Sequence, residues 1–292
     1  MELRNPLFIV GTGRCGSSAL HQLLSYHPHL AWLSQLCARF PTHPEVNRLA
    51  MLLLDSGLPS EFVRKHVRPS EAYAYWDHHF PGFSEPCRDL VREDVNGQVG
   101  QTLRASLSQM LTPQRHRLLI KITGWPRIGF LKAIFPDARF VHVYRDGRAV
   151  ACSLLERPWW GGWQGPAGWK WGELTAEQHA RWVASGKSFT VLAGIQWEIL
   201  MTAFEQARGN IPAEDWLEIS YDELCAYKRD ALHKIARFAS LEWSEEFDRR
   251  VEQFAFVNSD HKWRTQLNES EQRRLTEALR DPLTRLGFAA AP

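Results

Sequence analysis

The residues best placed to do chemistry form two short clusters, each following an apolar run. The first is Gly11-Thr12-Gly13-Arg14-Cys15-Gly16-Ser17-Ser18. Its glycines allow a sharp turn, so that backbone N–H groups and the positive end of a following helix converge on one point. The second pairs Arg145 with Ser153, about two helical turns further on. An arginine fork and a hydroxyl suit a phosphate monoester. Together the clusters predict a site for a nucleotide with anionic groups at both its 5′ and 3′ ends.

The first cluster has the shape of a Walker phosphate loop but lacks the lysine of that motif. A Walker loop reads G-x-x-x-x-G-K-[ST], whereas here Ser17 follows the second glycine and the loop's cation is Arg14. Kinases of this class bind a triphosphate whose charge is bridged by Mg²⁺. The displaced cation argues against that chemistry, although a P-loop kinase acting on a small molecule stays open as an alternative.

The order and spacing of these motifs resemble the sulfotransferases that use 3′-phosphoadenosine 5′-phosphosulfate (PAPS), in a bacterial-type form with some similarity to the tyrosylprotein sulfotransferases. The resemblance spans Leu7 to about Arg264. The family's 5′-phosphosulfate loop, [K/R]-x-G-[ST]-[ST], is matched by Arg14 to Ser18, and its 3′-phosphate motif by Arg145 and Ser153. The resemblance implies that the loop residues Arg14, Cys15, Gly16, Ser17, Ser18 and Ala19 bind the cofactor.

Two later segments extend the resemblance. Ile219–Leu224 is similar to the family's Y-E-D-L segment, which implies that Tyr221 contacts the adenine. His261–Arg264 resembles the S-K-W segment of tyrosylprotein-type members, which implies closure over the cofactor by Lys262, Trp263 and Arg264. For Arg148 both a cofactor contact and a structural salt bridge stay open.

The activity implied is transfer of a sulfuryl group to a hydroxyl, less often an amine, by in-line displacement. Arg14 would be the catalytic cation at the bridging oxygen, helped by N–H donors. Because the transferred group carries less charge than a triphosphate, no metal is expected. The acceptor would be a small molecule, a glycan or a lipid with a free hydroxyl.

The general base is not marked by a motif. In the tyrosylprotein-type arrangement a glutamate follows the first helix and a His-Pro pair, but here Gln35 stands about where it would be. Since a glutamine cannot usefully accept a proton, we take His78 and His79 as the candidate base, with Glu71 and Glu85 as weaker choices. A nucleotide-binding module without catalysis is the alternative from a different class.

Composition sets the remaining expectations. The chain has 292 residues, 44% of them apolar, and a formal net charge of +2, so a nucleic-acid partner is not expected. The five cysteines are widely spaced without a C-x-x-C, which argues against a disulfide framework or a zinc site and favours a reducing compartment. Without a signal segment or a transmembrane-length apolar window, a cytoplasmic protein is expected. The oligomeric state is left open.

The clusters must be positioned by a sheet. Apolar runs at 7–10, 117–122, 139–144 and 216–220 read as buried strands separated by helices, including an almost wholly apolar helix at 188–208. This alternation predicts a P-loop-like α/β/α fold of three layers with a mostly parallel sheet, in one domain covering 1–292. Ligands bind at the carboxyl ends of such strands. Two segments stand apart. One is a helical insertion at about 41–111, and the other is a Trp/Gly-rich loop at 158–172. The loop is either core packing, or a lid or acceptor platform whose indole faces stack on sugars or apolar rings.

Overall fold

The protein contains one parallel five-stranded sheet, in the order β2-β3-β1-β4-β5. The structure is a computed structural model that describes residues 2–56, 60–85 and 88–288. The strands are β1 Leu7–Gly11, β2 Leu30–Trp32, β3 Arg117–Thr123, β4 Arg139–Tyr144 and β5 Trp216–Ser220. This confirms the predicted α/β fold. The one strand that the apolar runs did not reveal is β2, which at three residues is too short to stand out as a run.

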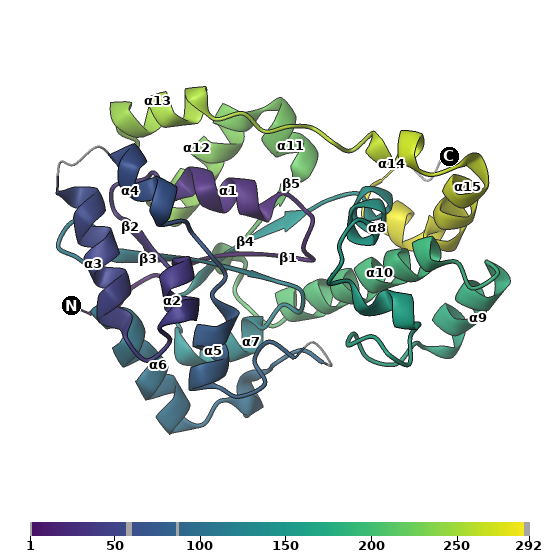
Figure 1. Cartoon of the computed structure of the whole chain (residues 1–292), viewed down its shortest axis with the longest axis horizontal. Helices are drawn as coiled ribbons and strands as arrows, with labels where there is room; N and C mark the ends of the chain where they lie inside the picture. The colour runs from purple at the N-terminus through teal and green to yellow at the C-terminus, as the bar shows by residue number, and fades with distance from the viewer. Residues whose placement is uncertain (1, 57–59, 86–87, 289–292) are drawn as a thin grey trace.

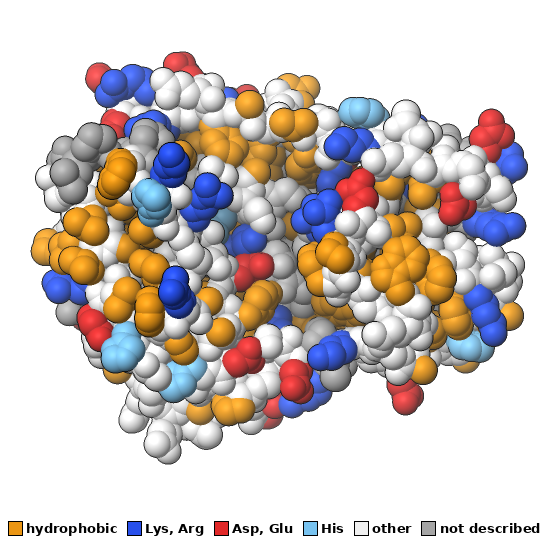
Figure 2. All heavy atoms as spheres, in the orientation of Figure 1, with side chains coloured by type: hydrophobic (Ala, Val, Ile, Leu, Met, Phe, Trp, Pro, Cys, Tyr) orange, Lys and Arg blue, Asp and Glu red, His pale blue; other side chains and the backbone are white. Residues whose placement is uncertain are grey.

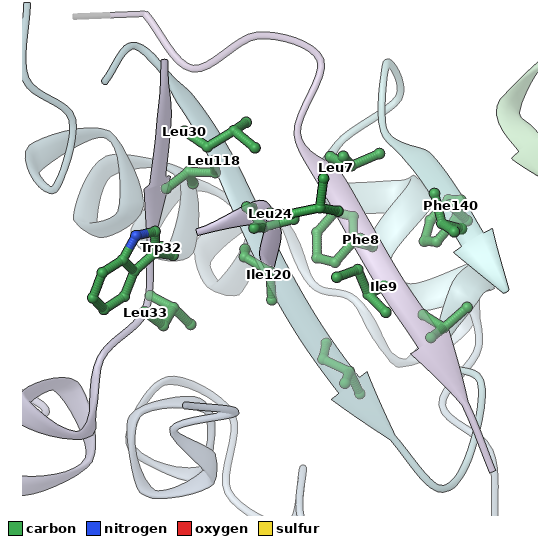
Figure 3. Packing of buried hydrophobic residues seen from close by; sticks show 14 of the residues in the cluster. Leu7, Phe8, Ile9, Leu24, Leu30, Trp32, Leu33, Leu118, Ile120 and Phe140 are labelled. Carbon is green, nitrogen blue, oxygen red and sulfur yellow. The ribbon is translucent and has the colours of Figure 1, made fainter. Parts of the chain in front are cut away.

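The centre of the sheet is apolar because β1 is covered on both faces. Every residue of β1 is buried, and Phe8 lies opposite Ile120 of β3 and Phe140 of β4. The rings of Phe8 and Phe140 stack with their centroids 5.4 Å apart, and Figure 3 shows them among leucines of the neighbouring strands. Each such side chain contributes about 1.5–3 kcal/mol on burial, so β1 is a rigid support for the loop that follows it.

Helices form the two outer layers. Figure 1 shows α1 and α12 on one side of the sheet and α7 and α10 on the other. The helices next to the sheet and at the C-terminal end of the chain are α1 Ser17–Leu24, α7 Ile128–Ile134, α8 Gly147–Leu155, α9 Ala176–Ala184, α10 Phe189–Arg208, α11 Tyr221–Ala226, α12 Lys228–Ala239, α13 Glu245–Gln253, α14 Lys262–Gln266, α15 Glu269–Ala278 and α16 Arg280–Arg285. Most of α10 is buried, as its sequence predicts.

The predicted insertion is helical and lies at one end of the molecule (Figure 1). Its helices, together with the short helix that precedes it, are α2 Gln35–Arg39, α3 Pro44–Asp55, α4 Ser60–His66, α5 Tyr73–His79 and α6 Gly97–Gln109. The Trp/Gly-rich loop at 158–172 has one 3₁₀ turn, Gly161–Gln164, and is otherwise irregular. Among the described residues, no helix is both long and apolar enough to cross a membrane.

Candidate functional site

The site lies where the sheet brings the ends of four strands together. β1 ends in the glycine loop, with β3 on one side of it and β4 on the other. Gly124 directly follows β3 and lines one cavity beside the loop. Arg145 and Tyr221 directly follow β4 and β5, and they line another cavity beside the loop. Figure 2 shows the face of the molecule hollowed between the end that carries the insertion and the end that carries α8, α9 and α10. This is the position expected for a ligand in an open parallel sheet.

The glycines of the loop are required by close packing. Gly16 caps α1 with a φ of 91°, and a Cβ there would lie 2.4 Å from Cδ2 of Tyr221. A Cβ at Gly11 would lie 2.5 Å from the carbonyl oxygen of Val143. Both positions therefore exclude a side chain. The ring of Tyr221 is packed on the loop itself, which ties the end of β5 to the start of α1.

The first of two cavities, here called the β4-side cavity, has a volume of about 310 Å³. It is lined by Arg14, Gly16, Ser17, Ser18, Ala19, Arg145, Ala149, Cys152, Ser153, Glu156, Arg157, Tyr221, Ser259, Lys262 and Gln266. The structure thus brings together most of the residues predicted to bind the nucleotide. Nε of Arg14 donates a hydrogen bond to Oγ of Ser153 at 3.0 Å, which joins the two predicted anion sites directly.

The cations of this cavity are crowded. Burial, together with the guanidinium groups of Arg157 and Arg145, lowers the pKa of Arg14. Placing like charges side by side costs free energy unless an anion lies between them. Glu156, which also lines the cavity and pairs with Arg157 at 2.9 Å, offsets part of this repulsion. The remaining excess of cations favours an anionic ligand.

Arg145 is held by three groups of the protein. Its Nε donates to the carboxylate of Asp260, its Nη2 to Oγ of Ser259 at 2.9 Å, and its Nη1 to the carbonyl oxygen of Arg14 at 3.0 Å. Its guanidinium also lies over the ring of Tyr221, 4.2 Å from the centroid. An anion that reaches Arg145 therefore meets Asp260, whose carboxylate already occupies part of the fork.

The segment around α14 contributes less to the cavity than its motif suggested. Lys262 lines the cavity, but Trp263 is 1% exposed and lies between the guanidinium groups of Arg148 and Arg264, at 4.6 and 4.5 Å from its ring centroid. Neither Trp263 nor Arg264 lines the cavity. Arg148 forms a salt bridge with Asp146 at 2.7 Å, the structural one of its two possible roles.

Cys15 lies behind the loop and not inside either cavity. It is fully buried, and its Sγ would be 2.6 Å from a Cβ placed at Gly11. A larger residue would be crowded against the backbone at Gly11. Cys15 thus shapes the loop through its size, while its backbone stays part of the turn.

The second cavity, here called the β3-side cavity, is larger, at about 650 Å³. Arg14, Ser17 and Ser18 line it as well, so the loop forms a wall of both cavities. The remaining lining comes mainly from the insertion, the end of β3 and the Trp/Gly-rich loop: Thr12, Gly13, Glu71, Tyr73, Ser84, Lys121, Thr123, Gly124, Trp125, Arg127, Leu154, Trp159, Trp160, Gly161, Gln164, Gly168, Lys170, Trp171 and Gln196.

Lys121 is a site residue that the sequence analysis missed. It lies on β3, is 8% exposed, and its Nζ donates to Oγ of Ser18 at 2.7 Å. The same Nζ lies 3.6 Å from Oε1 of Glu71, a carboxylate that also accepts a hydrogen bond from Oγ1 of Thr123. A lysine inside an otherwise apolar strand was the available signal, because such a charge needs a partner on burial.

His78 and His79, the predicted base pair, are not brought into this cavity. His78 is exposed, and His79 lines a shallow groove of about 470 Å³ on the insertion together with Gln101. Burial lowers the pKa of His79 to about 4. The first residue of α5, Tyr73, lines the cavity, whereas His78 and His79 are in the last turn of the helix and lie away from the cavity.

The remaining base candidates differ in position. Gln35 bridges two backbone groups of the insertion, donating to the carbonyl of His66 and accepting from the N–H of Arg68, both at 2.6 Å. Glu85 is exposed and lines neither cavity. Of the carboxylates named from the sequence, Glu71 is the one that lines the β3-side cavity.

Comparison with known proteins gives a match to a family model and matches to solved structures. A model described as the sulfotransferase family matches residues 6–245. No curated protein matches the chain.

Several solved structures share the fold. The sulfotransferase STF9 from Mycobacterium avium matches with a TM-score of 0.62 and 17% identity, covering 99% of this chain and 78% of that one. The sulfotransferase domain from the curacin biosynthetic pathway has a TM-score of 0.54 and 12% identity, with 99% of both chains covered. A sulfotransferase from Alicyclobacillus acidocaldarius has a TM-score of 0.52 and 14% identity, covering 97% of this chain and 94% of that one.

Proposed function

The chain belongs to the sulfotransferase family, and we propose that it transfers a sulfuryl group from PAPS to a hydroxyl, or less readily an amine, of an acceptor. The observation that carries the proposal is the shared wall: Arg14, Ser17 and Ser18 line both cavities. A group held by the loop in one cavity is therefore presented to a molecule in the other. The β4-side cavity would hold the nucleotide and the β3-side cavity the acceptor.

The residues of the β4-side cavity fit the nucleotide. The N–H groups at the start of α1, the hydroxyls of Ser17 and Ser18 and the side chain of Arg14 would bind the 5′-phosphosulfate. Arg145 and Ser153 would bind the 3′-phosphate, for which Asp260 has to give up its place on the guanidinium. Tyr221 and Lys262 line the same cavity and would contact the rest of the nucleotide.

The transfer needs a proton acceptor and a stabilised leaving group. The acceptor oxygen forms a bond to sulfur while the bond from sulfur to the bridging phosphate oxygen breaks, and the hydroxyl proton passes to a base. Glu71 is the carboxylate in the β3-side cavity that can take this proton. Arg14 and Lys121 would stabilise the negative charge that develops on the leaving oxygen and on the sulfuryl group.

Two measurements test the proposal. We expect 3′-phosphoadenosine 5′-phosphate (PAP) to raise the melting temperature by several degrees, because a ligand that binds only the folded state stabilises it. ADP should raise it less, and ATP with Mg²⁺ no more than ADP. A selective response to ATP with Mg²⁺ would instead support the kinase alternative.

The second measurement is turnover with PAPS across a panel of hydroxyl acceptors. Formation of PAP with a sulfated product is the expected result. Tight PAP binding without any sulfation over a broad panel would instead support the catalytically inactive module, and absence of PAP binding would overturn the proposal.

A further inference from the structure

The walls of the β3-side cavity are unusually aromatic. Tyr73 comes from the insertion, Trp125 follows β3, and Trp159, Trp160 and Trp171 come from the Trp/Gly-rich loop. Three segments far apart in the chain thus place rings around one space. Indole faces offer flat, apolar surfaces that stack on planar or ring-shaped ligands.

Two of these rings are held in fixed positions. Trp160 is 2% exposed, and its Nε1 donates to Oε1 of Gln196 at 2.7 Å. Trp171 packs on the backbone at Gly124, where a Cβ would lie 3.4 Å from its Cη2. The ring of Trp125 lies 6.5 Å from that of Trp171, between centroids, at an angle of 37°. The part of the wall formed by Trp160 and Trp171 is therefore preformed, so a matching ring binds there with little cost in ordering the protein.

Some of the polar groups of the cavity wall are committed to hydrogen bonds within the protein. Arg127 donates from Nε and Nη2 to the carbonyl of Phe83 and from Nη1 to that of Trp125. The hydroxyl of Tyr73 donates to the carbonyl of Thr123 at 2.6 Å. Together with the Trp160–Gln196 bond, these contacts occupy the polar groups of Tyr73, Arg127 and Trp160, so Tyr73 and Trp160 offer a ligand mainly their rings. The polar side chains of the wall without such a partner among the described residues include Ser17, Ser84, Gln164 and Lys170.

Three of the polar residues that line the cavity are well exposed. Ser84, Gln164 and Lys170 are exposed residues of the insertion and the Trp/Gly-rich loop, and they face solvent at the cavity's edge. The charged groups beside the glycine loop are Arg14, Glu71 and Lys121. The cavity therefore combines a reactive wall, aromatic sides and a polar mouth.

We infer that the acceptor is a phenol-type compound: a flat aromatic ring system whose ring hydroxyl reaches Glu71 and the loop. Its body lies against the tryptophans, and any polar substituent points to the mouth. A cavity of 650 Å³ is in the range that holds a ligand of a few rings. A planar ring fixes the direction of its hydroxyl, which a linear alcohol does not. The identity of the reacting hydroxyl rests on the proposed function, whereas the ring-binding cavity does not.

The first experiment measures binding without turnover. Isothermal titration of the PAP complex with 2-naphthol, 1-octanol and methyl β-D-glucoside should show binding of 2-naphthol at least about tenfold tighter than either of the others. Preference for the glucoside or the alkanol would overturn the inference, whatever the outcome of the activity assays.

Matched variants locate the effect on the cavity wall. Trp171→Ala should weaken 2-naphthol binding by about tenfold, and Trp171→Phe should restore most of it. Tyr227→Ala is the control, because Tyr227 is an aromatic residue that is 66% exposed and lines neither cavity. The Kd for PAP should change less than about twofold in all three variants. Equal losses in Tyr227→Ala and Trp171→Ala would overturn the role of the wall.

Turnover separates this inference from the proposed function. With PAPS, 2-naphthol should be sulfated with the highest kcat/KM of the three probes. Sulfation of the glucoside together with no binding of 2-naphthol would remove the inference and keep the proposed function. Binding of 2-naphthol with no sulfation of any acceptor would keep the aromatic ring site and contradict the proposed function.

Discussion

The β4-side and β3-side cavities share the glycine loop but are built in different ways. The β4-side cavity takes its key groups from residues next to strand ends and helix starts, such as Gly16, Arg145 and Tyr221. The β3-side cavity gathers Glu71, Lys121 and the tryptophans from separate segments. An anion can be bound by backbone N–H groups and one arginine fork, which short motifs encode. A ring-shaped space has to be assembled by the tertiary fold.

The largest effect is expected where the two cavities meet. Arg14→Ala should lower kcat by about 100- to 1,000-fold, because it removes the cation beside the leaving oxygen. Stopped assays with PAPS and a saturating acceptor measure this loss. The melting temperature should stay within about 2 °C, because the change also removes the repulsion between Arg14 and the guanidinium groups of Arg157 and Arg145. Arg157→Ala, which lines the β4-side cavity alone, is the matched control and should lose far less. Retention of the wild-type rate by Arg14→Ala would show that the cavities do not meet at a reactive cation.

The next largest effect is expected for a substitution in the β3-side cavity that lowers kcat and leaves nucleotide binding unchanged. Glu71→Gln should lower kcat by about 100-fold, because the amide cannot take the acceptor proton. The Kd for PAP should change less than about twofold, since Glu71 does not line the β4-side cavity. Glu85→Gln and the double variant His78→Gln/His79→Gln serve as controls. A larger loss in the histidine variant than in Glu71→Gln would return the base to the position predicted from the sequence.

A smaller effect is expected on the nucleotide side alone. In an Arg145→Gln/Asp260→Asn double variant, which avoids leaving a buried carboxylate unpaired, the Kd for PAP should rise about 30-fold. Binding of adenosine 5′-phosphosulfate, which has no 3′-phosphate, should be nearly unchanged by titration calorimetry. Equal losses for both nucleotides would mean that Arg145 shapes the loop and does not read the 3′ end.

The smallest effect has the opposite sign. Asp260→Asn should tighten PAP binding by about threefold at pH 7.5, because the 3′-phosphate no longer competes with a carboxylate for Arg145. Burial, with the neighbouring Asp222, raises the pKa of Asp260 to about 6. The stabilisation linked to this raised pKa is complete below the unfolded value near 4 and is lost as the pH rises through about 6. The melting temperature of the wild type relative to Asp260→Asn should therefore fall between pH 4 and pH 7; a flat difference would contradict this coupling.

The part of the molecule that could be predicted from sequence is the part encoded locally. The apolar runs at β1, β3, β4 and β5 and the Gly11–Ser18 loop stand out because burial and turn geometry restrict the residue types. Lys121 could not be assigned in the same way. A single lysine in an apolar strand indicates that its charge needs a partner. It does not indicate whether that partner is solvent, a carboxylate or a ligand until the loop and the insertion are placed beside it.

The S-K-W-like segment is the converse case. Its residues matched a motif, but only Lys262 lines the β4-side cavity, while Trp263 is buried between two arginines. The helix α14 turns successive residues in different directions, so a run of three residues cannot all face one ligand. The choice of His78 and His79 rests on the expectation that the insertion lines the acceptor pocket. Part of the insertion does so, but these two residues lie at the end of α5 away from the cavity.

The two hydrogen bonds that hold Arg14 have a consequence for selectivity among nucleotides. Its carbonyl accepts from Arg145 and its side chain donates to Ser153, so both candidate 3′-phosphate ligands also hold the cation at the reacting end. Under the proposed function, a donor that lacks the 3′-phosphate leaves these contacts as they are in the free protein. A donor that carries it shifts both partners of Arg14 at once. Abundant nucleotides such as ATP would then be rejected in two ways. They would bind more weakly, and their binding would not shift the contacts that hold Arg14 at the reacting end.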